Sequence, residues 1–241
     1  MRRKSLILAL LVVLILLGGV GTALALLVSH EPAYYRRGAI AAGKQRQIWS
    51  NQFFEEFMNL CNALQHDDLT WRAEFTPEQI NAYLQEGFIS SGLDEKMLPD
   101  RVENPRFALD EDRLRLGFRY GRGRWTAIIT IDLRLWIAQG EPNTVALELL
   151  GLHAGALPIS AQSLLEYVSD AARRMTFTDG QRVVDVSWFR HNGHPVALLR
   201  FGPDRPRSTV HLTHVELKAG QIILQGRSAA SSAPTTSTAS N

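Results

Sequence analysis

The chain has few of the features that mark a catalytic or disulfide-stabilised protein. Its 241 residues include one cysteine, Cys61, so the chain cannot form an internal disulfide. Gly-x-Ser-x-Gly, His-Glu-x-x-His and P-loop motifs are all absent, which removes the common sequence signatures of serine hydrolases, zinc proteases and nucleotide-binding enzymes. We therefore expect a non-enzymatic protein that holds no cofactor.

Clustered positive charge is also missing. The chain has 26 Lys and Arg residues against 24 Asp and Glu residues, and three of the basic residues belong to the short leader Arg2-Arg3-Lys4. Beyond this leader, no run of basic residues is longer than two. A nucleic-acid partner would require a concentrated positive surface, so we expect this protein to have none.

An uncharged segment near the N-terminus gives the clearest signal. Residues 6–28 contain no charged side chain, and a helix of this length measures about 35 Å, which is long enough to cross a bilayer. A cleaved signal peptide stays open as an alternative, because Gly18-Gly19 would interrupt the helix after residues 6–17 and Ala23-Leu24-Ala25 fits a cleavage site. The apolar run continues to Val28 and is longer than the apolar region of a typical signal peptide, about 7–15 residues, which favours a retained transmembrane helix.

The flanks of the apolar segment bear on its orientation. A short basic leader, residues 1–5, directly before an apolar helix is typical of chains whose N-terminus stays in the cytoplasm. We therefore predict a single-pass protein of the cell membrane, whose C-terminal domain is extracytoplasmic. The positive-inside count alone is nearly balanced, because four basic residues follow the segment: Arg36, Arg37, Lys44 and Arg46.

About three amphipathic helices are predicted after the membrane segment. Residues 38–65 carry apolar residues at three- and four-residue spacing, a pattern typical of core packing but also of an interfacial or partner-binding helix. Thr76-Pro77-Glu78-Gln79 is a capping box that begins a second helix, for which Gly92 is a plausible end. Ser160 is a good N-cap for a third helix, which has Arg173 and Arg174 in its last turn.

The remaining chain changes to a period of two, which predicts strands. Residues 114–120 and 127–137 alternate apolar and polar side chains around Gly121-Arg122-Gly123, as in a long hairpin. Five further strands are expected at 144–153, 183–190, 195–201, 210–218 and 221–227. This grouping favours an α+β fold with an antiparallel, strongly curved sheet over a doubly wound α/β fold.

These elements define the predicted organisation of the chain. Residues 1–5 form a cytoplasmic leader and residues 6–28 the transmembrane helix, followed by a juxtamembrane helix and linker at 29–69. The extracytoplasmic α+β domain occupies residues 70–227. Residues 228–241 contain neither charge nor large apolar side chains, so they cannot bury a core and are expected to form a disordered tail.

Four histidines raise the possibility of a metal site. His191 and His194 lie in a turn, and His211 and His214 lie in a predicted strand, so adjacent hairpins could bring the two pairs together as zinc ligands. However, residues three apart on a strand point to opposite faces, so His211 and His214 would diverge without a bulge. We therefore predict no metal, and a metal-dependent hydrolase is the third of three functional hypotheses.

Two short segments resemble a known family. Phe75-Thr76-Pro77-Glu78-Gln79-Ile80-Asn81-Ala82-Tyr83-Leu84 is similar to the strand, Thr-x-x-Gln-Leu-Asn and helix that open the YpmS-like family of uncharacterised bacterial membrane-anchored proteins. Leu152-His153-Ala154-Gly155-Ala156-Leu157-Pro158-Ile159-Ser160 resembles the Gly-x-Leu-Pro-hydrophobic turn of that family. The resemblance implies a tubular lipid-binding-like domain and assigns no catalytic residue. In physical terms, Asn81 could hydrogen-bond a neighbouring strand, and Gly155 with Pro158 would let a strand bend.

The amount of one-sided apolar strand leads to two further hypotheses. The first is a domain that binds a lipid or other amphiphile on its apolar strand faces. The second is a structural or protein-interaction module of the cell envelope, with a filled core and a surface for an envelope protein. Periodicity alone does not separate them. The candidate ligand-binding residues of the first hypothesis are Leu116, Phe118, Ile129, Ile131, Leu133, Leu147 and Leu149.

Overall fold

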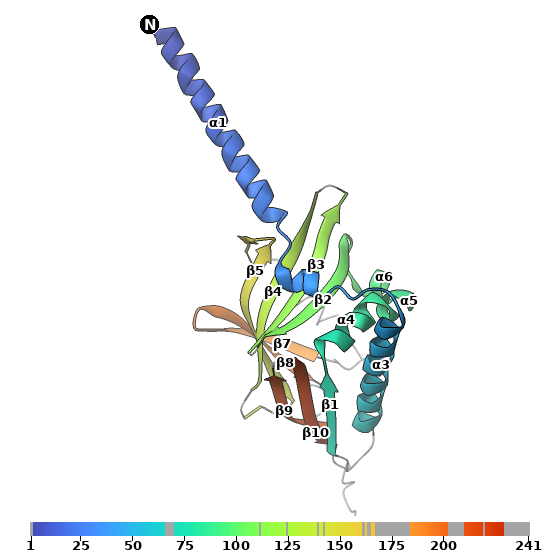
Figure 1. Cartoon of the computed structure of the whole chain (residues 1–241). Coiled ribbons are helices and arrows are strands. Elements are labelled where there is room, and N and C mark those ends of the chain that lie inside the picture. The colour runs from blue at the N-terminus through green and yellow to red at the C-terminus, as the bar shows by residue number, and fades with distance from the viewer. Residues whose placement is uncertain are drawn as a thin grey trace, which may run out of the picture.

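The computed structural model combines one long helix, two open sheets and a group of smaller helices (Figure 1). Because the chain folds back on itself several times, strands from its beginning and end lie in one sheet. The structure describes residues 2–65, 70–110, 112–123, 125–138, 140–141, 143–160, 162, 165–166, 184–201, 210–218 and 220–228.

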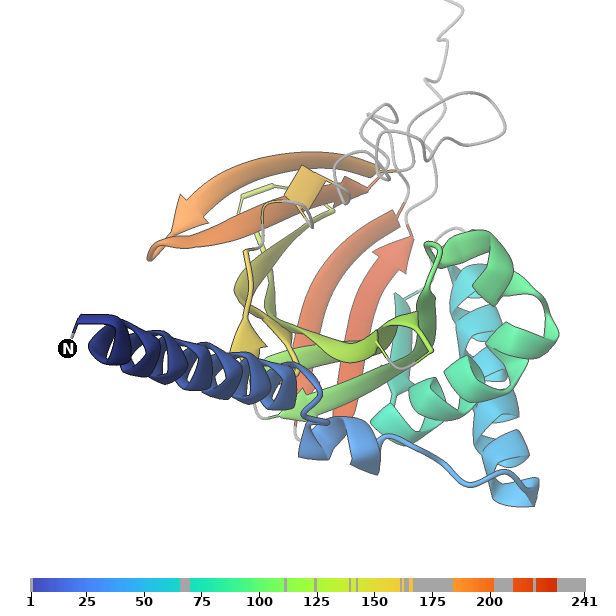
Figure 2. The same cartoon turned by 90° about the horizontal axis from the view of Figure 1, so that it is seen from above.

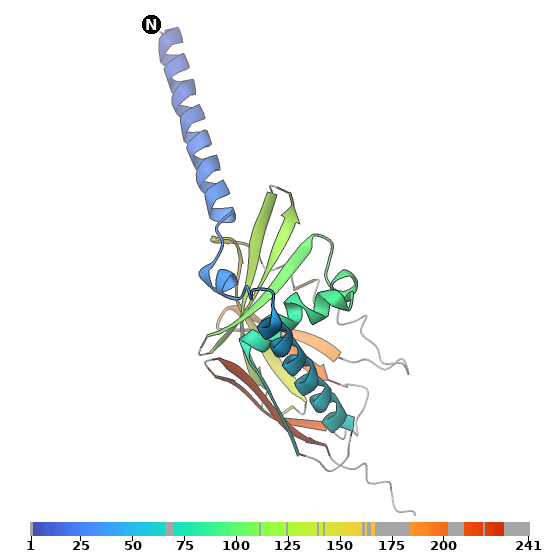
Figure 3. The same cartoon turned by 45° about the vertical axis from the view of Figure 1, so that its right-hand side comes forward.

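The N-terminal apolar segment forms helix α1 (Arg2–Val28), which extends away from the folded domain (Figures 1 and 3). Residues 11–27 of this helix are exposed, so a long apolar surface has no protein to cover it. By length and composition, the described residues contain one helix able to cross a membrane. A helix that could anchor the chain in a membrane is thus confirmed, while its orientation stays a prediction.

The strands form two antiparallel sheets instead of the single strongly curved sheet that we expected. The larger sheet has the order β2 (Val102–Asp110), β3 (Arg113–Arg122), β4 (Trp125–Ile137), β5 (Thr144–Ala154), β8 (His194–Phe201) and β7 (Val184–His191), with β6 (Leu157–Pro158) paired to β5. The smaller sheet has the order β1 (Thr70–Phe75), β10 (Gln221–Ser228) and β9 (Val210–Lys218).

The α+β class and the antiparallel pairing are confirmed, but the strong curvature is not supported. Neither sheet is closed or strongly curled. The physical reason lies in the last two strands, because β10 pairs with β1 and β9 pairs with β10, so that neither strand extends the edge at β7. The smaller sheet instead contacts the larger one through β9, which touches β2 and β4.

Among the residues that the structure describes, five helices with both ends defined follow α1, and four of them lie together beside β1 and β2, away from β7 and β8 (Figures 1 and 2). The predicted helix at 38–65 is confirmed from residue 44 onwards, and a separate short helix precedes it. The five are α2 (Ala33–Arg37), α3 (Lys44–Gln65), α4 (Pro77–Gln85), α5 (Gly87–Ser90) and α6 (Leu93–Met97).

Helix α4 begins at the predicted capping box. The Thr76 hydroxyl oxygen accepts a hydrogen bond from the Gln79 N–H (3.2 Å), and the Gln79 side-chain oxygen accepts one from the Thr76 N–H (3.0 Å). The helix ends at Gln85, before the predicted end at Gly92, and the two short helices α5 and α6 follow it. Gly92 itself adopts a left-handed conformation (φ 65°) before α6.

Two predictions near the C-terminus lie largely outside the described residues. Of the helix expected from Ser160, only residues 162, 165 and 166 are described after the N-cap, and all three are helical. Of the predicted tail at 228–241, only Ser228 is described, as the last residue of β10.

Asn81 connects the helices to the larger sheet. Its side-chain nitrogen donates to the Phe107 carbonyl oxygen (2.7 Å), and its side-chain oxygen accepts from the Phe107 N–H (2.8 Å). Strand β2 is an edge strand, so Asn81 satisfies the two backbone groups of Phe107 that no neighbouring strand pairs. The predicted hydrogen bond from Asn81 to a strand is confirmed, and it fixes α4 against the sheet that carries the candidate site.

Candidate functional site

The apolar face of the larger sheet gathers all seven candidate residues. Cross-strand pairs place Leu116 beside Ile131 and Phe118 beside Ile129 on β3 and β4. On the other side of β4, Leu133 pairs with Leu149 and Leu135 pairs with Leu147. All seven belong to one packed cluster, together with Leu114, Leu152 and Leu165.

The cluster has a buried part and a more open part. Ile131, Leu133 and Leu149 are between 5% and 8% exposed, so they are core side chains. The other four candidates are only partly buried and pack around this centre. Leu152 is a fourth buried member that the alternating pattern did not indicate, because a β-bulge between Leu149 and Gly151 brings it to the same face.

The apolar stripe of β3 continues towards α1 and ends in a pocket. Tyr120 follows Leu114, Leu116 and Phe118 at the same two-residue spacing and pairs with Ala127 of β4. The pocket has a volume of about 790 Å³ and is lined by residues from the end of α1 and from the tip of the β3–β4 hairpin. Its lining residues are Leu24, Ala25, Val28, Ser29, Arg101, Tyr120, Gly121, Arg122, Thr126 and Ala127.

The end of α1 is fixed on the domain beside this pocket. The Ala156 N–H donates a hydrogen bond to the Leu27 carbonyl oxygen (2.8 Å), and the Gly155 N–H donates to the Ile128 carbonyl oxygen (2.7 Å). Gly155 has a φ of 60°, and a Cβ atom there would overlap the carbonyl oxygens of Leu27 and Val28. Only glycine therefore allows the turn between β5 and β6 to lie this close to α1.

The opposite face of the sheet is polar and is partly covered by α2. The Tyr34 hydroxyl shares a hydrogen bond of 2.8 Å with the Thr130 hydroxyl, and the Tyr35 hydroxyl donates to the Asn104 carbonyl oxygen (2.8 Å). Gly117 lies beneath the two rings, where a Cβ atom would overlap the Tyr34 hydroxyl. These contacts hold the segment that follows α1 against the sheet.

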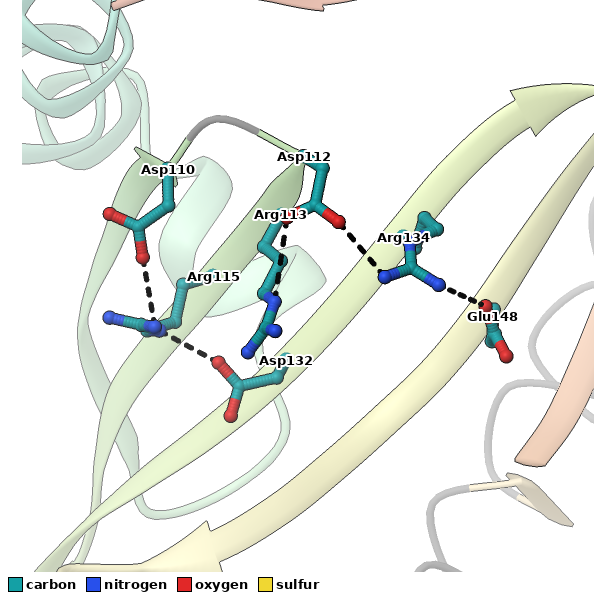
Figure 4. Close-up of polar contacts among 7 residues, drawn as sticks. All are labelled: Asp110, Asp112, Arg113, Arg115, Asp132, Arg134 and Glu148. Carbon is teal, nitrogen blue, oxygen red and sulfur yellow. Dashed lines mark hydrogen bonds and ion pairs between the residues drawn. The ribbon is translucent and has the colours of Figure 1, made fainter. Parts of the chain in front are cut away.

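Acidic and basic side chains form two groups of ion pairs on this polar face (Figure 4). Arg115 of β3 contacts Asp110 of β2 (2.9 Å) and Asp132 of β4 (2.7 Å). Arg134 of β4 contacts Asp112 (2.9 Å) and Glu148 of β5 (3.3 Å). The first group links β2, β3 and β4, and the second links β3, β4 and β5, so that together these two groups, the network of the polar face, add side-chain contacts to the backbone hydrogen bonds of four adjacent strands.

Glu148 is the most buried member of the network. Its side chain is 2% exposed, whereas that of Arg134 is 39% exposed. The hydrogen bond to Asp112 raises the pKa of the Arg134 guanidinium above its ordinary value, and the nearby charges of Asp112 and Glu148 raise it further. The carboxylates are thus held by guanidinium groups, an arrangement that stabilises charge and suits a structural role better than proton transfer.

The histidines do not form a ligand set in the described part of the chain. His191 and His194 face each other at the turn between β7 and β8, while His211 and His214 belong to β9 in the other sheet. The His214 imidazole lies 3.5 Å from Glu216. Among the described residues, no three His, Cys, Asp or Glu side chains are placed to hold one metal ion.

Comparison of the chain with protein-family models, curated proteins and solved structures finds no match in any of the three. The resemblance to the YpmS-like family therefore stays a prediction. Two local features expected at the resembling segments are nevertheless present, since Asn81 binds β2 and Gly155 lies in the turn that ends β5. The geometry of the pocket and of the two sheet faces is the basis for a functional proposal.

Proposed function

We propose that this chain is a single-pass membrane protein whose extracytoplasmic domain binds a lipid or other amphiphile, without catalysis. The observation that carries the proposal is the continuity between the apolar face of β3 and the pocket beside α1. Tyr120 and Ala127 lie at the end of that face and line the pocket, and α1 forms its other wall.

The position of the pocket suits a ligand that comes from the bilayer. If α1 lies in a membrane, Leu24, Ala25 and Val28 are in its last turns, where the apolar segment leaves the hydrocarbon region. A pocket against these residues opens at the membrane surface. Its volume of about 790 Å³ is within the range of roughly 300–1,000 Å³ that is usual for small-molecule sites.

The seven candidate residues would then have two roles. Leu116, Phe118, Ile129 and Leu147 are partly buried, so they can contact an acyl chain that extends from the pocket along the sheet. The buried residues Ile131, Leu133 and Leu149 would support this surface from within the core. The proposal therefore places the ligand at the open end of the apolar cluster.

Filling the pocket tests the proposal. The full chain would be reconstituted in phosphatidylcholine vesicles that contain a small amount of phosphatidylcholine with a photoactivatable acyl chain, and lipid crosslinks would be mapped by mass spectrometry. We expect crosslinks in residues 116–129 as well as in α1. The substitution Ala127→Trp should decrease the crosslinks in residues 116–129 on the order of tenfold, because the indole ring would occupy the space of the acyl chain.

A matched control separates pocket filling from a general effect of tryptophan. Ser187 is an exposed residue of β7 and does not line the pocket. The variant Ser187→Trp should therefore keep the wild-type crosslinks. Wild-type crosslinks confined to α1 would contradict lipid binding and favour a filled core.

A second candidate function, docking of an envelope protein, is favoured by the surface of α3. Phe54, Phe57 and Met58 are exposed on this helix, and their side chains form a small apolar surface outside the core. With a photocrosslinking amino acid at Phe54 or Met58, a docking function predicts one dominant crosslinked protein in cells. The same probe at exposed Gln52 should not give this product, and a diffuse pattern from all three positions would argue against docking.

A further inference from the structure

The pocket beside α1 has a polar rim that consists of two arginines. Arg101 precedes β2 and Arg122 ends β3, and both are exposed and line the pocket. The pairing of Val102 with Tyr120 and a hydrogen bond from the Gly121 N–H to the Arg101 carbonyl oxygen (3.2 Å) bring the two arginines to the same end of the sheet. Their positions are set by strand pairing and are thus defined by the fold.

Unlike several other arginines among the described residues, the two arginines of the pocket form no ion pair with an acidic side chain. Five other arginines form ion pairs: Arg46, Arg72, Arg113, Arg115 and Arg134. Within the described part of the chain, neither Arg101 nor Arg122 forms one, and the residues that line the pocket include no Asp or Glu. Two positive charges that an anion could neutralise therefore lie on the rim of this pocket, while the acidic side chains of Asp100 and Glu103 line a neighbouring pocket that Arg101 also borders.

The backbone at Arg101 is a second indication of function. Its φ of 71° lies in the left-handed region, which is unfavourable for residues with a side chain and which non-glycine residues rarely adopt. Glycine would avoid this cost. An arginine in such a conformation, at the rim of a pocket, is typical of a site at which the side chain is needed.

The neighbours of the arginines indicate where the anion is located. Leu24, Ala25 and Val28 form the wall opposite the arginines and belong to the end of the membrane helix. Phosphate groups of a bilayer lie just outside the hydrocarbon region, at the level at which this helix ends. Tyr120, which is 45% exposed beside Arg122, has the amphipathic side chain that is enriched at this level.

We infer that Arg101 and Arg122 bind the phosphate of an anionic phospholipid in the leaflet where α1 ends, with the acyl chain of that lipid in the apolar part of the pocket. This inference rests on the proposed lipid-binding function and adds a selectivity for the headgroup. Guanidinium groups suit it because each can donate two hydrogen bonds to one phosphate. The membrane-side rim would then select phosphatidylglycerol over phosphatidylcholine.

The test compares two lipids in the same membrane. The full chain would be placed in nanodiscs that contain equal amounts of phosphatidylcholine and phosphatidylglycerol, both with a photoactivatable acyl chain, and crosslinks in residues 116–129 would be counted for each lipid. We expect the wild type to prefer phosphatidylglycerol. Arg101→Gln and Arg122→Gln should each decrease this preference on the order of fivefold, and the double variant should abolish it.

The control has the same change of charge at a different place near the membrane. Arg36 and Arg37 are exposed in the last turn of α2 and do not line the pocket. Arg36→Gln with Arg37→Gln should keep the preference for phosphatidylglycerol. An equal loss in this control would overturn the inference, because general attraction to the membrane surface would then explain the preference. An unchanged preference in the double variant Arg101→Gln with Arg122→Gln would also overturn it.

The outcome for phosphatidylcholine keeps the two proposals distinguishable. If the headgroup inference alone fails, the wild type still crosslinks both lipids in residues 116–129, with no preference that depends on Arg101 and Arg122. If lipid binding itself fails, neither lipid crosslinks there, and labelling is confined to α1. Addition of soluble glycerol phosphate should not displace the lipid, because the acyl chain contributes binding that the free anion lacks.

Discussion

Replacement of Asn81 by leucine is expected to decrease the free energy of unfolding by about 2–4 kcal/mol. Asn81 is 3% exposed and satisfies both backbone groups of Phe107, at 2.7 and 2.8 Å. Leucine has a similar volume but can neither donate nor accept, so a buried N–H and a buried C=O would both lose their partner. Urea unfolding of the full chain in detergent, followed by tryptophan fluorescence, measures the change.

The control for Asn81 is an asparagine that makes no comparable contact. Asn51 is exposed on α3, and the same substitution there should change the free energy of unfolding by less than about 0.5 kcal/mol. The expected loss at Asn81 is specific to the edge of the sheet, because β2 would have no cover for its unpaired backbone. A change at Asn81 as small as that at Asn51 would show that water satisfies Phe107 equally well.

The hairpin of β3 and β4 was predictable because its two faces differ so strongly. One face carries apolar side chains, such as Leu116 and Ile131, over most of its length, and the other carries Arg115, Asp132 and Arg134. A strict alternation of this kind leaves only one register compatible with a buried face. The same reason explains why the seven candidate residues, chosen from their period, are found in one cluster.

Strand β2 was not predicted because its sequence interrupts the alternation. Asn104 has a φ of 51°, and the pairing with β3 shifts between Glu103 and Arg106, so the first part of the strand contains a bulge. Pro105 follows in the same irregular part. A period-two pattern detects strands with a regular pleat, and this strand obtains its order from Asn81 and from β3 instead.

The division into two sheets depends on contacts that no local pattern contains. Strands β9 and β10 are neighbours both in the predicted single sheet and in the observed smaller sheet, and the sequence does not state which third strand this pair joins. The pairing of β10 with β1 connects segments about 150 residues apart, from Trp71 to Gly226. Here a Cβ atom on Gly226 would overlap the Trp71 ring, so this pairing requires a glycine opposite a large aromatic side chain.

The pocket beside α1 was likewise not predicted, because its two walls are distant in the sequence. Its position depends on the contact between Leu27 and Ala156, and on the conformation of Gly155. A partial signal was nevertheless present, since Tyr120 extends the apolar stripe of β3 by one further position. Arg122 next to this aromatic residue, in a hairpin tip, gives the amphipathic composition of a membrane interface.

The substitution Arg134→Met is expected to destabilise the domain by about 3 kcal/mol, near the lower end of the range for breaking a buried ion pair. Glu148 is 2% exposed and depends on Arg134 for its contact at 3.3 Å, so its charge would remain buried without compensation. The cost falls short of the upper end of that range because Arg134 is 39% exposed and water already screens it. Urea unfolding of the full chain again provides the measurement.

Two variants show whether the unpaired carboxylate is the cause. Arg113 forms an ion pair with Asp112 at 3.5 Å in which both side chains are exposed. Arg113→Met should therefore decrease the free energy of unfolding by less than about 1 kcal/mol. Adding Glu148→Gln to Arg134→Met should recover most of the lost stability, because the neutral amide no longer needs a cation. If the double variant is no more stable than Arg134→Met, the loss comes from packing of the Arg134 stem along β4, and the network of the polar face contributes little through its charges.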